Sequence, residues 1–480
     1  DFCGPDEARL LRYRMRPSRS HLATAHSLWA EPDADDLAAA LREAVARAPD
    51  PAIAARAAAA RARARALADG SAHAARLTAA CASLLLAPPP SALRLAFVST
   101  FAVPCGVAEY SRALLDALLA GAAPGTIRAS LLCDDRTNPA EPAPGDAALR
   151  PCWLVGDPAA AGPIALAIAR EDPDAVVIQH QSGLLPWAAL GELLADPRLA
   201  GRIVLVALHN PRDLLTLDAP ARARVLAALG RPERLLVHTI SDLDFLQDLG
   251  LEQNCSLFPQ GAPPPAPALP ARPLPPGSDP VIGCHGFFLP HKGIDDLIAA
   301  GARLRPRWPG LRLRLVNAEY PAAQGGAASG DAIAACRALA ASLGVADMVE
   351  WETSFLPAAR AKELLRGCDL LVLPYRESAE SSSAAVRAVL ATGVPVALSR
   401  VAIFADAATA AAPLTPSDPA AMAAEIAALL ADPAARAGLS AAAREWLARH
   451  AWPAIAGRLR GLLLSLAATS RLDPPAWPLR

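Results

Sequence analysis

Apolar runs of strand length alternate with amphipathic helical stretches along most of the chain. Before residue 262 these runs begin at Leu93 (LRLAFVSTF), Ala175 (AVVIQH), Arg202 (RIVLVALHN), Arg234 (RLLVHTIS) and Cys255 (CSLFPQG). After residue 280 the alternation returns, with runs that begin at Val281, Leu311, Met348 and Cys368. Continuous apolar strands separated by helices are typical of parallel sheets with both faces covered. The pattern predicts an α/β fold with two doubly wound, Rossmann-like domains.

A proline-rich segment separates the two sets of strands. GAPPPAPALPARPLPPGSDP, which ends at Pro280, has too many prolines for a strand or a helix interior and predicts a semi-rigid linker. We therefore expect an N-terminal domain over 91–262, a linker over 263–280, a C-terminal domain over 281–450 and a helical tail over 451–480 that packs back on the N-terminal domain. Because open α/β sheets bind ligands at the carboxyl ends of their strands, an active site is expected in a cleft between the two domains.

Residues 1–90 do not follow this pattern and are interpreted as part of a repeat. SLWAEPDADDLAAALREAVARAPDP, from Ser27, parallels APLTPSDPAAMAAEIAALLADP, from Ala412, because each has an apolar lead-in, a helix, an Asp-Pro pair and a second helix. The alternative is that two helix pairs rich in alanine and arginine are alike by composition alone. We expect residues 1–90 to be the C-terminal tail of a preceding, similar domain. The start at Asp1 rather than at methionine also suggests a piece of a longer chain.

Composition limits the classes of partner and compartment. With 480 residues, 53% hydrophobic content and a net charge of −1, the chain has no basic stripe for nucleic acid. No apolar run reaches the roughly 18 residues of a membrane span, so any membrane contact is expected to be peripheral. The nine cysteines are spread singly, which favours a reduced, cytoplasmic protein. The nine histidines lack the spacing of a metal site on one element, so no metal is predicted.

A serine-rich segment stands where a helix is expected to begin. ESAESSSAAVRAVLATGVPV, from Glu377 to Val396, follows one apolar strand and leads into another. Serine suits the first turn of a helix, where backbone N–H groups are free, better than a helix interior. Glu380 precedes the three serines Ser381, Ser382 and Ser383. With the helix dipole they predict a cradle for an anion such as a diphosphate, although capping alone would explain one serine or two.

Lysine occurs only at Lys292 and Lys362, in a chain that otherwise uses arginine. Lys292 lies in GFFLPHKG, between Gly286 and Gly293, after a predicted strand. A lysine kept where arginine is the default suggests that a compact charge is needed. Such a charge can stabilise an anion without a metal. The structural alternative is a surface lysine in a loop.

These motifs and their order resemble the GT-B glycosyltransferases of family 4, which are retaining enzymes that use a nucleotide-activated sugar. The resemblance covers residues 93–480 and implies that Glu380 contacts the donor sugar, while Lys292 and Gly286 lie in the loop that binds the donor phosphates. Two positions depart from the family pattern, because Ala388 replaces a second glutamate and Phe287 replaces an arginine. The serine-rich variant is similar to a subset of these enzymes from bacterial surface-polysaccharide pathways, of the O-antigen mannosyltransferase type.

Two loops of the N-terminal domain carry further candidate donor-binding residues. In STFAVPCGVAEYSRALL, Gly106 leads the turn into a helix, and the resemblance implies that this loop lies near the donor phosphate and the acceptor. His209 and Asn210 end the run ALHN, where the resemblance implies a histidine that contacts the donor sugar. His180, at the end of VVIQH, is a second candidate. Turn glycines and strand-end histidines also have purely structural roles.

Two Asp-x-Asp pairs, Asp172 with Asp174 and Asp242 with Asp244, match the manganese-binding motif of glycosyltransferases of another fold. The first pair precedes a buried strand, and the second follows Ser241 at a predicted helix start. Turn and cap roles therefore explain both pairs. We expect neither a metal nor another cofactor.

The resemblance implies a metal-independent hexosyltransferase. It would move a sugar from a nucleoside-diphosphate sugar to a glycan or lipid-linked glycan acceptor in cell-surface polysaccharide synthesis. The repeat adds the expectation of further glycosyltransferase domains on the same polypeptide. Phe287 and Ala388 keep two alternatives open: a catalytically silent GT-B module that binds glycan or scaffolds a partner transferase, and a GT-B sugar-nucleotide epimerase.

Overall fold

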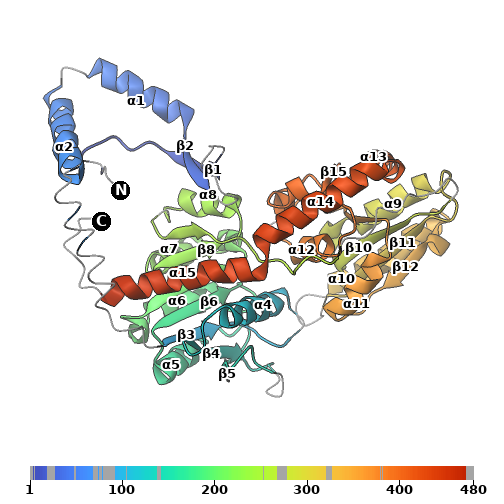
Figure 1. Ribbon diagram of the computed structural model, residues 1–480, viewed down its shortest axis with the longest axis horizontal. Helices are drawn as coiled ribbons and strands as arrows, with labels where there is room; N and C mark the ends of the chain where they lie inside the picture. The colour runs from blue at the N-terminus through green and yellow to red at the C-terminus, as the bar shows by residue number, and fades with distance from the viewer. Residues whose placement is uncertain are drawn as a thin grey trace. The chain divides into compact units, whose positions relative to one another are not determined.

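The computed structural model describes residues 4, 6–18, 27–47, 50–68, 74, 78, 92–103, 105–137, 142–251, 253–267, 278–320, 327–378, 380 and 382–471. The chain divides into two compact units (Figure 1). The smaller unit comprises Asp1–Leu93, Pro124–Thr126 and Leu466–Arg480, and the larger unit comprises Arg94–Ala123 and Ile127–Ser465. Most of the predicted linker, residues 268–277, lies outside the described residues.

The first sheet of the larger unit has seven strands in the order β5-β4-β3-β6-β7-β8-β9. Its strands are β3 (Leu93–Val98), β4 (Ile127–Asp134), β5 (Ala148–Trp153), β6 (Ala175–His180), β7 (Ile203–Leu208), β8 (Arg234–Val237) and β9 (Cys255–Leu257). The helices around it are α4 (Gly106–Ala120), α5 (Ala161–Glu171), α6 (Trp187–Ala195), α7 (Ala219–Leu229) and α8 (Ile240–Asp248). The strand order reverses between the parallel neighbours β3 and β6. The predicted doubly wound arrangement is confirmed for this half of the chain.

The sequence pattern predicted the fully buried strands of this sheet and missed two partly exposed ones. Every residue of β6 and β7 is buried, which agrees with their continuous apolar runs. The pattern did not predict β4 or β5. Of the six residues of β5, at the edge of the sheet, only Trp153 is buried, and β4 begins with two residues that are not buried. A strand that is partly exposed lacks the continuous apolar run that made its neighbours recognisable.

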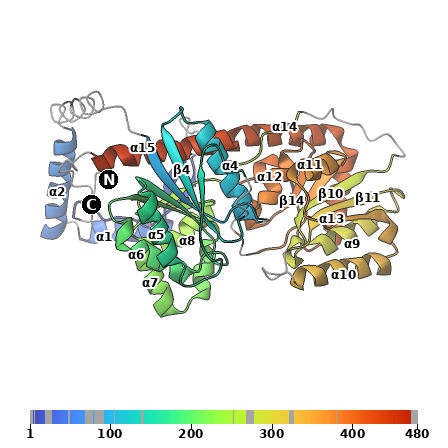
Figure 2. The same ribbon diagram turned by 90° about the horizontal axis from the view of Figure 1, so that it is seen from below.

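The second sheet has six strands, all parallel, in the order β12-β11-β10-β13-β14-β15. Its strands are β10 (Val281–Phe287), β11 (Arg312–Ala318), β12 (Val349–Glu352), β13 (Leu370–Leu373), β14 (Val396–Ser399) and β15 (Ala412–Leu414). Its helices are α9 (Ile294–Leu304), α10 (Ala327–Ser342), α11 (Ala358–Arg366), α12 (Ala384–Leu390), α13 (Pro419–Ala431) and α14 (Pro433–His450). Helices α9, α10 and α13 cover one face, and α11, α12 and α14 cover the other (Figure 2). The second predicted doubly wound sheet is also confirmed, although the three-residue β15 was not predicted.

Two passages of the chain between the sheets run side by side. Ala262 forms a parallel bridge with Ala451, and the Trp452 N–H donates to the Ala262 carbonyl at 3.2 Å. Helix α15 (Trp452–Arg471) begins at this point and lies beside α4 (Figures 1 and 2). The ring of Trp452 packs edge-on against Tyr110 of α4, with ring centroids 5.2 Å apart. The C-terminal helix is therefore in contact with a helix of the first sheet.

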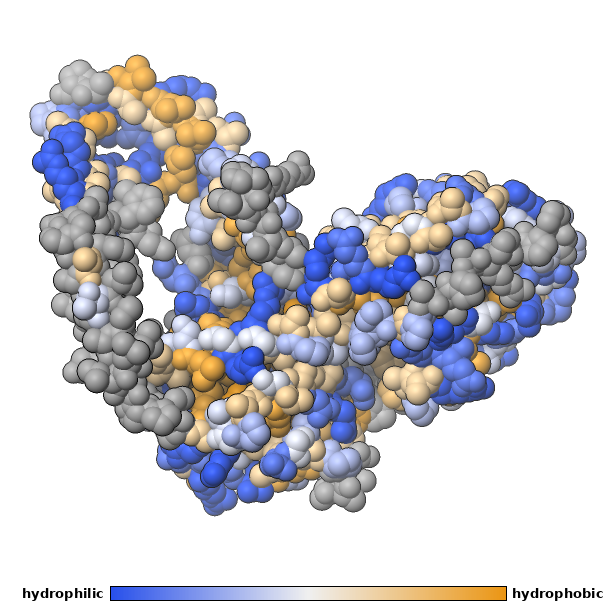
Figure 3. Space-filling view, viewed as in Figure 1, coloured by the Kyte–Doolittle hydropathy of each residue, from blue (hydrophilic) through white to orange (hydrophobic). Residues whose placement is uncertain are grey.

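The described part of the smaller unit includes a hairpin, two helices that follow it and the last residues of α15. Strands β1 (Tyr13–Pro17) and β2 (Leu28–Pro32) are antiparallel, and α1 (Ala34–Ala46) and α2 (Pro51–Ala68) follow. Asp33 caps α1, where its side chain accepts a hydrogen bond from a backbone N–H of the first turn. Hydrophobic residues gather on the visible face of α1 (Figure 3).

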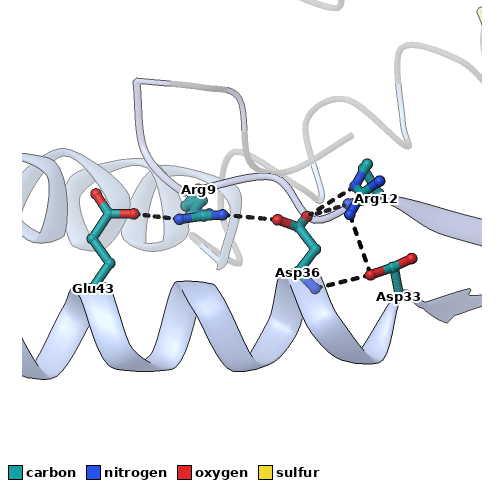
Figure 4. A network of polar contacts seen from close by, with 5 residues as sticks. All are labelled: Arg9, Arg12, Asp33, Asp36 and Glu43. Atoms are coloured by element: carbon teal, nitrogen blue, oxygen red, sulfur yellow. Dashed lines mark hydrogen bonds and ion pairs between the residues drawn. The ribbon is translucent and has the colours of Figure 1, made fainter.

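An ion-pair network holds the N-terminal segment to the polar face of α1 (Figure 4). The Arg9 guanidinium donates to Asp36 at 2.8 Å and also to Glu43. The Arg12 backbone N–H donates to the second carboxylate oxygen of Asp36 at 2.8 Å, and its guanidinium donates to Asp33 at 3.4 Å. One face of α1 is therefore covered by polar contacts from its own unit.

The described residues include neither a disulfide bond nor a helix that could span a membrane. Seven cysteines there are unpaired: Cys105, Cys133, Cys152, Cys255, Cys284, Cys336 and Cys368. Among the described helices, none is both long and apolar enough to cross a membrane.

Candidate functional site

Lys292 and Glu380 form an ion pair at the carboxyl edge of the second sheet. Lys292 ends the short turn Pro290–Lys292 after β10, and Glu380 lies in the loop between β13 and α12. The lysine Nζ is 2.8 Å from the Glu380 Oε2, although the two residues are 88 positions apart. The lysine side chain is 7% exposed and the glutamate side chain is 41% exposed. β10 and β13 are the neighbours at which the strand order reverses, which is where open α/β sheets bind ligands.

Backbone contacts hold these two loops together. Gly293 has a φ of +65°, and a β carbon at this position would lie 2.0 Å from the carbonyl oxygen of Pro374, so only glycine fits. The Arg376 N–H donates to the His291 carbonyl at 2.8 Å. The Arg376 guanidinium donates to Asp296, in the first turn of α9, at 2.8 Å. Sequence reasoning missed Arg376, which lies three residues after the buried strand β13.

Tyr375 lies under the ammonium group of Lys292. The Nζ is 4.1 Å from the centroid of the ring, and the tyrosine is fully buried. A cation over a desolvated aromatic ring is stabilised by about 2 kcal/mol or more. Gly286 makes room for this ring, because a β carbon there would lie 3.2 Å from the tyrosine hydroxyl oxygen. The sequence pattern identified Gly286 but gave Tyr375 no role.

The electrostatics of the pair favour a charged carboxylate. Burial acts to raise the pKa of Glu380, but the contact with His291 and the charge of Lys292 outweigh burial and lower this pKa to about 2. The His291 Nε2 is 3.4 Å from the Glu380 Oε1. Burial lowers the pKa of Lys292, and the neighbouring carboxylate partly offsets that effect. The arrangement is a buried cation whose partner carboxylate is partly exposed, so hydroxyl groups can contact the carboxylate.

A pH dependence of stability follows from the lowered pKa of Glu380. The folded-state pKa is about 2 and the unfolded-state pKa is about 4.3, so the stabilisation is present above about pH 4.3 and is lost as pH falls towards 2. We expect the difference in free energy of unfolding between wild type and Glu380→Gln to shrink as the pH falls from about 4 towards 2. Urea unfolding at each pH measures this difference. Glu192→Gln, at an exposed position of α6, serves as control and should show no such change; a Glu380→Gln difference as flat as the control would contradict the assignment.

The three serines occupy different environments. Ser381 lies outside the described residues. The Ser382 hydroxyl donates to the Gln260 side-chain oxygen at 3.1 Å, in the loop after β9. Ser383 is the N-cap of α12 and is buried, but its side chain makes no capping hydrogen bond. The diphosphate cradle stays a prediction, with the first-turn N–H groups of α12 next to Ser383.

A buried arginine ties this loop to the end of the first sheet. Arg387 of α12 is 1% exposed, and its guanidinium donates to the Gln260 carbonyl at 3.3 Å, to the Ser383 carbonyl at 3.0 Å and to the Asp406 carboxylate. A buried guanidinium needs such partners, because an unpaired buried charge is costly. The sequence signal was a single arginine in the otherwise apolar helix AAVRAVL.

The two positions that depart from the family pattern carry no charge in this protein. Phe287, where the resemblance implies an arginine, packs edge-on against Tyr320 with centroids 5.0 Å apart and stacks with Phe355 with centroids 6.0 Å apart. Ala388 lies in α12 and is partly buried. Aromatic packing therefore occupies the position of the missing cation.

His209 belongs to a network of neutral groups at the carboxyl edge of the first sheet. Its Nε2 is 2.9 Å from the Gln179 side-chain oxygen, and its Nδ1 is 3.2 Å from the His238 Nε2. The His238 Nδ1 is 3.0 Å from the Phe258 carbonyl, which only accepts, so this Nδ1 carries the hydrogen. The neutral His238 then accepts from the His209 Nδ1–H, and the Gln179 amide must turn its nitrogen towards the His209 Nε2.

Burial keeps both rings neutral at pH 7. It lowers the pKa of His238 to about 4, and burial together with the proximity of His238 and His180 lowers the pKa of His209 well below its ordinary value. Tyr110 of α4 packs edge-on against His209, with centroids 4.8 Å apart. Sequence reasoning missed His238, although it ends a strand in the same way as His180 and His209. A sugar contact by His209 stays a prediction.

The other candidates of the first sheet lie close to strand ends but not at the ion pair. His180 is fully buried against Trp187, with centroids 4.0 Å apart, and burial lowers its pKa to about 3. The Asn210 amide donates to Asp213 at 2.6 Å. Gly106 is the first residue of α4, and a β carbon there would meet no atom within 4 Å. The open space beside Gly106 would let a ligand approach this turn. A larger residue would also fit at this position, so the structure does not require glycine there.

The Asp-x-Asp pairs have structural partners. Asp172 and Asp174 both pair with Arg94, at 2.8 and 3.1 Å. Asp242 lies in the first turn of α8, where its backbone N–H donates to the side chain of Thr239. Thr239 is therefore the helix cap, two residues before the predicted start at Ser241. Metal independence stays a prediction.

Comparison with known proteins identifies the fold. Residues 267–446 match the sequence model of the family described as "Glycosyl transferases group 1". No curated protein matches the chain. Sucrose-phosphate synthase from Thermosynechococcus elongatus is similar in structure, with a TM-score of 0.62 and 19% identity over 78% of this chain and 100% of that chain.

Two further solved structures share the arrangement. Anabaena HepE in complex with UDP has a TM-score of 0.58 and 15% identity over 78% of this chain and 100% of that chain. The α,α-trehalose 6-phosphate synthase from Burkholderia multivorans has a TM-score of 0.63 and 12% identity over 81% of this chain and 99% of that chain. The two sheets of this chain form the GT-B fold, and the second sheet lies in the region that matches the glycosyltransferase group 1 model.

Proposed function

We propose that this protein is a retaining, metal-independent glycosyltransferase of the family 4 type. It moves a hexose from a nucleoside-diphosphate sugar to a hydroxyl group of a glycan or lipid-linked glycan. The serine-rich motif supports a role in bacterial cell-surface polysaccharide synthesis of the O-antigen type. The reaction takes place in the cytoplasm, with no contact to the membrane other than a peripheral one.

The observation that carries this proposal is the Lys292–Glu380 pair. A buried ammonium group 2.8 Å from a half-exposed carboxylate stands at the strand-order reversal, inside the region that matches the glycosyltransferase family. A diphosphate that approaches Lys292 replaces one anionic partner by another, so the cation never becomes an unpaired buried charge. The released Glu380 carboxylate then accepts hydrogen bonds from sugar hydroxyls.

The chemical step needs only this chain's residues and the two substrates. The bond between the anomeric carbon and the donor phosphate oxygen breaks, and a bond from that carbon to the acceptor oxygen forms on the same face. The departing phosphate takes the acceptor proton. Lys292 stabilises the negative charge that develops on the leaving diphosphate, and Glu380 orients the sugar.

Two alternatives rest on Phe287 and Ala388, where charged groups of the family pattern are missing. A silent module would bind glycan or a partner transferase without turnover. An epimerase would act on the sugar nucleotide without an acceptor. Release of free nucleotide only when an acceptor is present separates sugar transfer from both alternatives.

A calorimetric titration tests the donor site directly. Wild type is titrated with UDP, GDP and their common sugar conjugates, and we expect one base to bind. Lys292→Ala should weaken this binding at least tenfold, because a hydrogen bond to a charged group contributes about 1.5–3 kcal/mol. Lys362→Ala on α11, the chain's other lysine, should bind as wild type does. No binding by wild type would favour the silent module, and equal binding by Lys292→Ala would remove Lys292 from the site.

A further inference from the structure

An apolar stripe on α1 of the smaller unit has little cover among the residues that the structure describes. Leu37, Leu41 and Val45 follow one another at intervals of four, so they share one side of the helix. Leu41 is 59% exposed and Val45 is 79% exposed. Trp29, on the strand before the helix, is 52% exposed. No described residue of α1 is buried.

The same positions are buried in the C-terminal part of the larger unit. Asp33 caps α1, and Asp418 caps α13 in the same way. Counted from these caps, the positions at −4, +4, +8 and +12 are Trp29, Leu37, Leu41 and Val45 in the smaller unit and Leu414, Met422, Ile426 and Leu430 in the larger unit. Leu414, Met422 and Ile426 are 0% exposed and Leu430 is 2% exposed. Helices α1 and α13 therefore have apolar residues at the same positions relative to their caps. These residues are buried in α13 but not in α1.

The larger unit shows what covers such a stripe. Helix α13 packs on α9, and Leu414 ends β15, which pairs with β14. Met422, Ile426 and Leu430 belong to the same hydrophobic core as Leu297 and Ile298 of α9. The cover is thus a parallel sheet with a helix on the same face.

The next helices of the two units, α2 and α14, resemble each other only at their first residues. Asp50 precedes Pro51 of α2 as Asp432 precedes Pro433 of α14, and each aspartate accepts a backbone hydrogen bond from the first turn. Trp446 of α14, which is buried, has no aromatic counterpart in α2. The repeat is therefore strongest at the strand and at α1.

The described residues of the N-terminal segment contact the opposite side of α1 from the stripe. Arg9 and Arg12 contact Asp36 and Glu43, which lie one helical repeat of seven residues apart on the polar side of α1 (Figure 4). At about 100° per residue, Leu41 is turned roughly 140° away from Asp36. The apolar side is the one coloured hydrophobic over α1 in Figure 3.

We propose that Trp29, Leu37, Leu41 and Val45 form a docking surface for a parallel α/β domain built like residues 281–411 of this protein. That partner would contain a parallel sheet and a helix equivalent to α9. Its last strand and the helix that follows would be supplied by β2 and α1 of the smaller unit. The smaller unit completes the partner as β15 and α13 complete the second sheet of the larger unit. The partner domain is carried by the same polypeptide, in the complete product of its gene.

Peptide-resolved maleimide labelling tests this proposal. Val45→Cys is made in the 480-residue chain and in the complete translation product of its gene, and Glu192→Cys is the exposed control in both. We expect the thiol introduced at position 45 to react at least tenfold more slowly in the complete product than in the 480-residue chain, while the control thiol at position 192 reacts equally in both. In urea the protection at position 45 should disappear.

Three results would overturn the proposal. One is equal labelling at position 45 in both proteins. The second is a complete product that encodes no further parallel α/β domain. The third is protection at position 45 in the 480-residue chain that rises with protein concentration, since a second copy would then be the occupant. Val45 is highly exposed, so its substitution leaves the unit folded, and the labelling does not depend on sugar transfer.

Discussion

Lys292→Ala is expected to lower the turnover of sugar transfer by a factor of about 10² to 10³, which is the usual cost of removing one charge-stabilising donor from an active site. The loss arises in the chemical step, because the ammonium group stabilises charge that develops on the leaving diphosphate. Lys292→Arg should not restore turnover, because the larger planar guanidinium does not fit the enclosed position above the Tyr375 ring. Steady-state release of nucleotide, with the base found by calorimetry, measures the effect.

The fold of Lys292→Ala should be nearly intact. The Glu380 side chain is already 41% exposed, so it returns to water when its partner is removed. Glu380→Ala should also lose turnover by orders of magnitude, but it leaves an ammonium group buried and so should lower the free energy of unfolding more. Lys362→Ala is the matched control and should keep wild-type turnover. Turnover close to that of wild type in both Lys292→Ala and Glu380→Ala would refute the assignment of the site.

Gly293→Ala is expected to lower the free energy of unfolding by about 2 to 5 kcal/mol, from left-handed backbone strain of about 1–2 and overpacking of about 1–3. The φ of Gly293 is +65°, and its added β carbon would lie 2.0 Å from the Pro374 carbonyl oxygen. That oxygen belongs to the backbone and cannot swing away as a side chain would. The midpoint of urea unfolding measures the loss.

Gly344→Ala separates the two causes of this loss. Gly344 has nearly the same φ, +68°, but a β carbon there would meet no atom within 4 Å. It should therefore show the strain alone, about 1–2 kcal/mol. The excess in Gly293→Ala then reports how tightly the Lys292 loop is held against the strand that leads to Glu380. Equal losses in the two variants would mean that this close approach relaxes freely.

The long-range contacts of the site were not visible in the sequence. Sequence reasoning selected Lys292 by its rarity and Glu380 by its motif, but their pairing joins residues 88 positions apart. Tyr375 under the ammonium group and Arg376 on α9 sit inside a run that was identified only as a strand and a loop. Neither residue repeats with a period, so no local pattern marks them.

The sequence by itself determined the alternation of strands and helices and the two doubly wound sheets. These features are local, because buried parallel strands are continuous apolar runs. Tertiary structure alone decided that Ser382 bonds Gln260, that His209 meets His238 and that the edge strand β5 exists. The two contacts depend on which distant segments come together, and the edge strand depends on which face of the sheet is left exposed. The spacing of residues along one segment does not determine either.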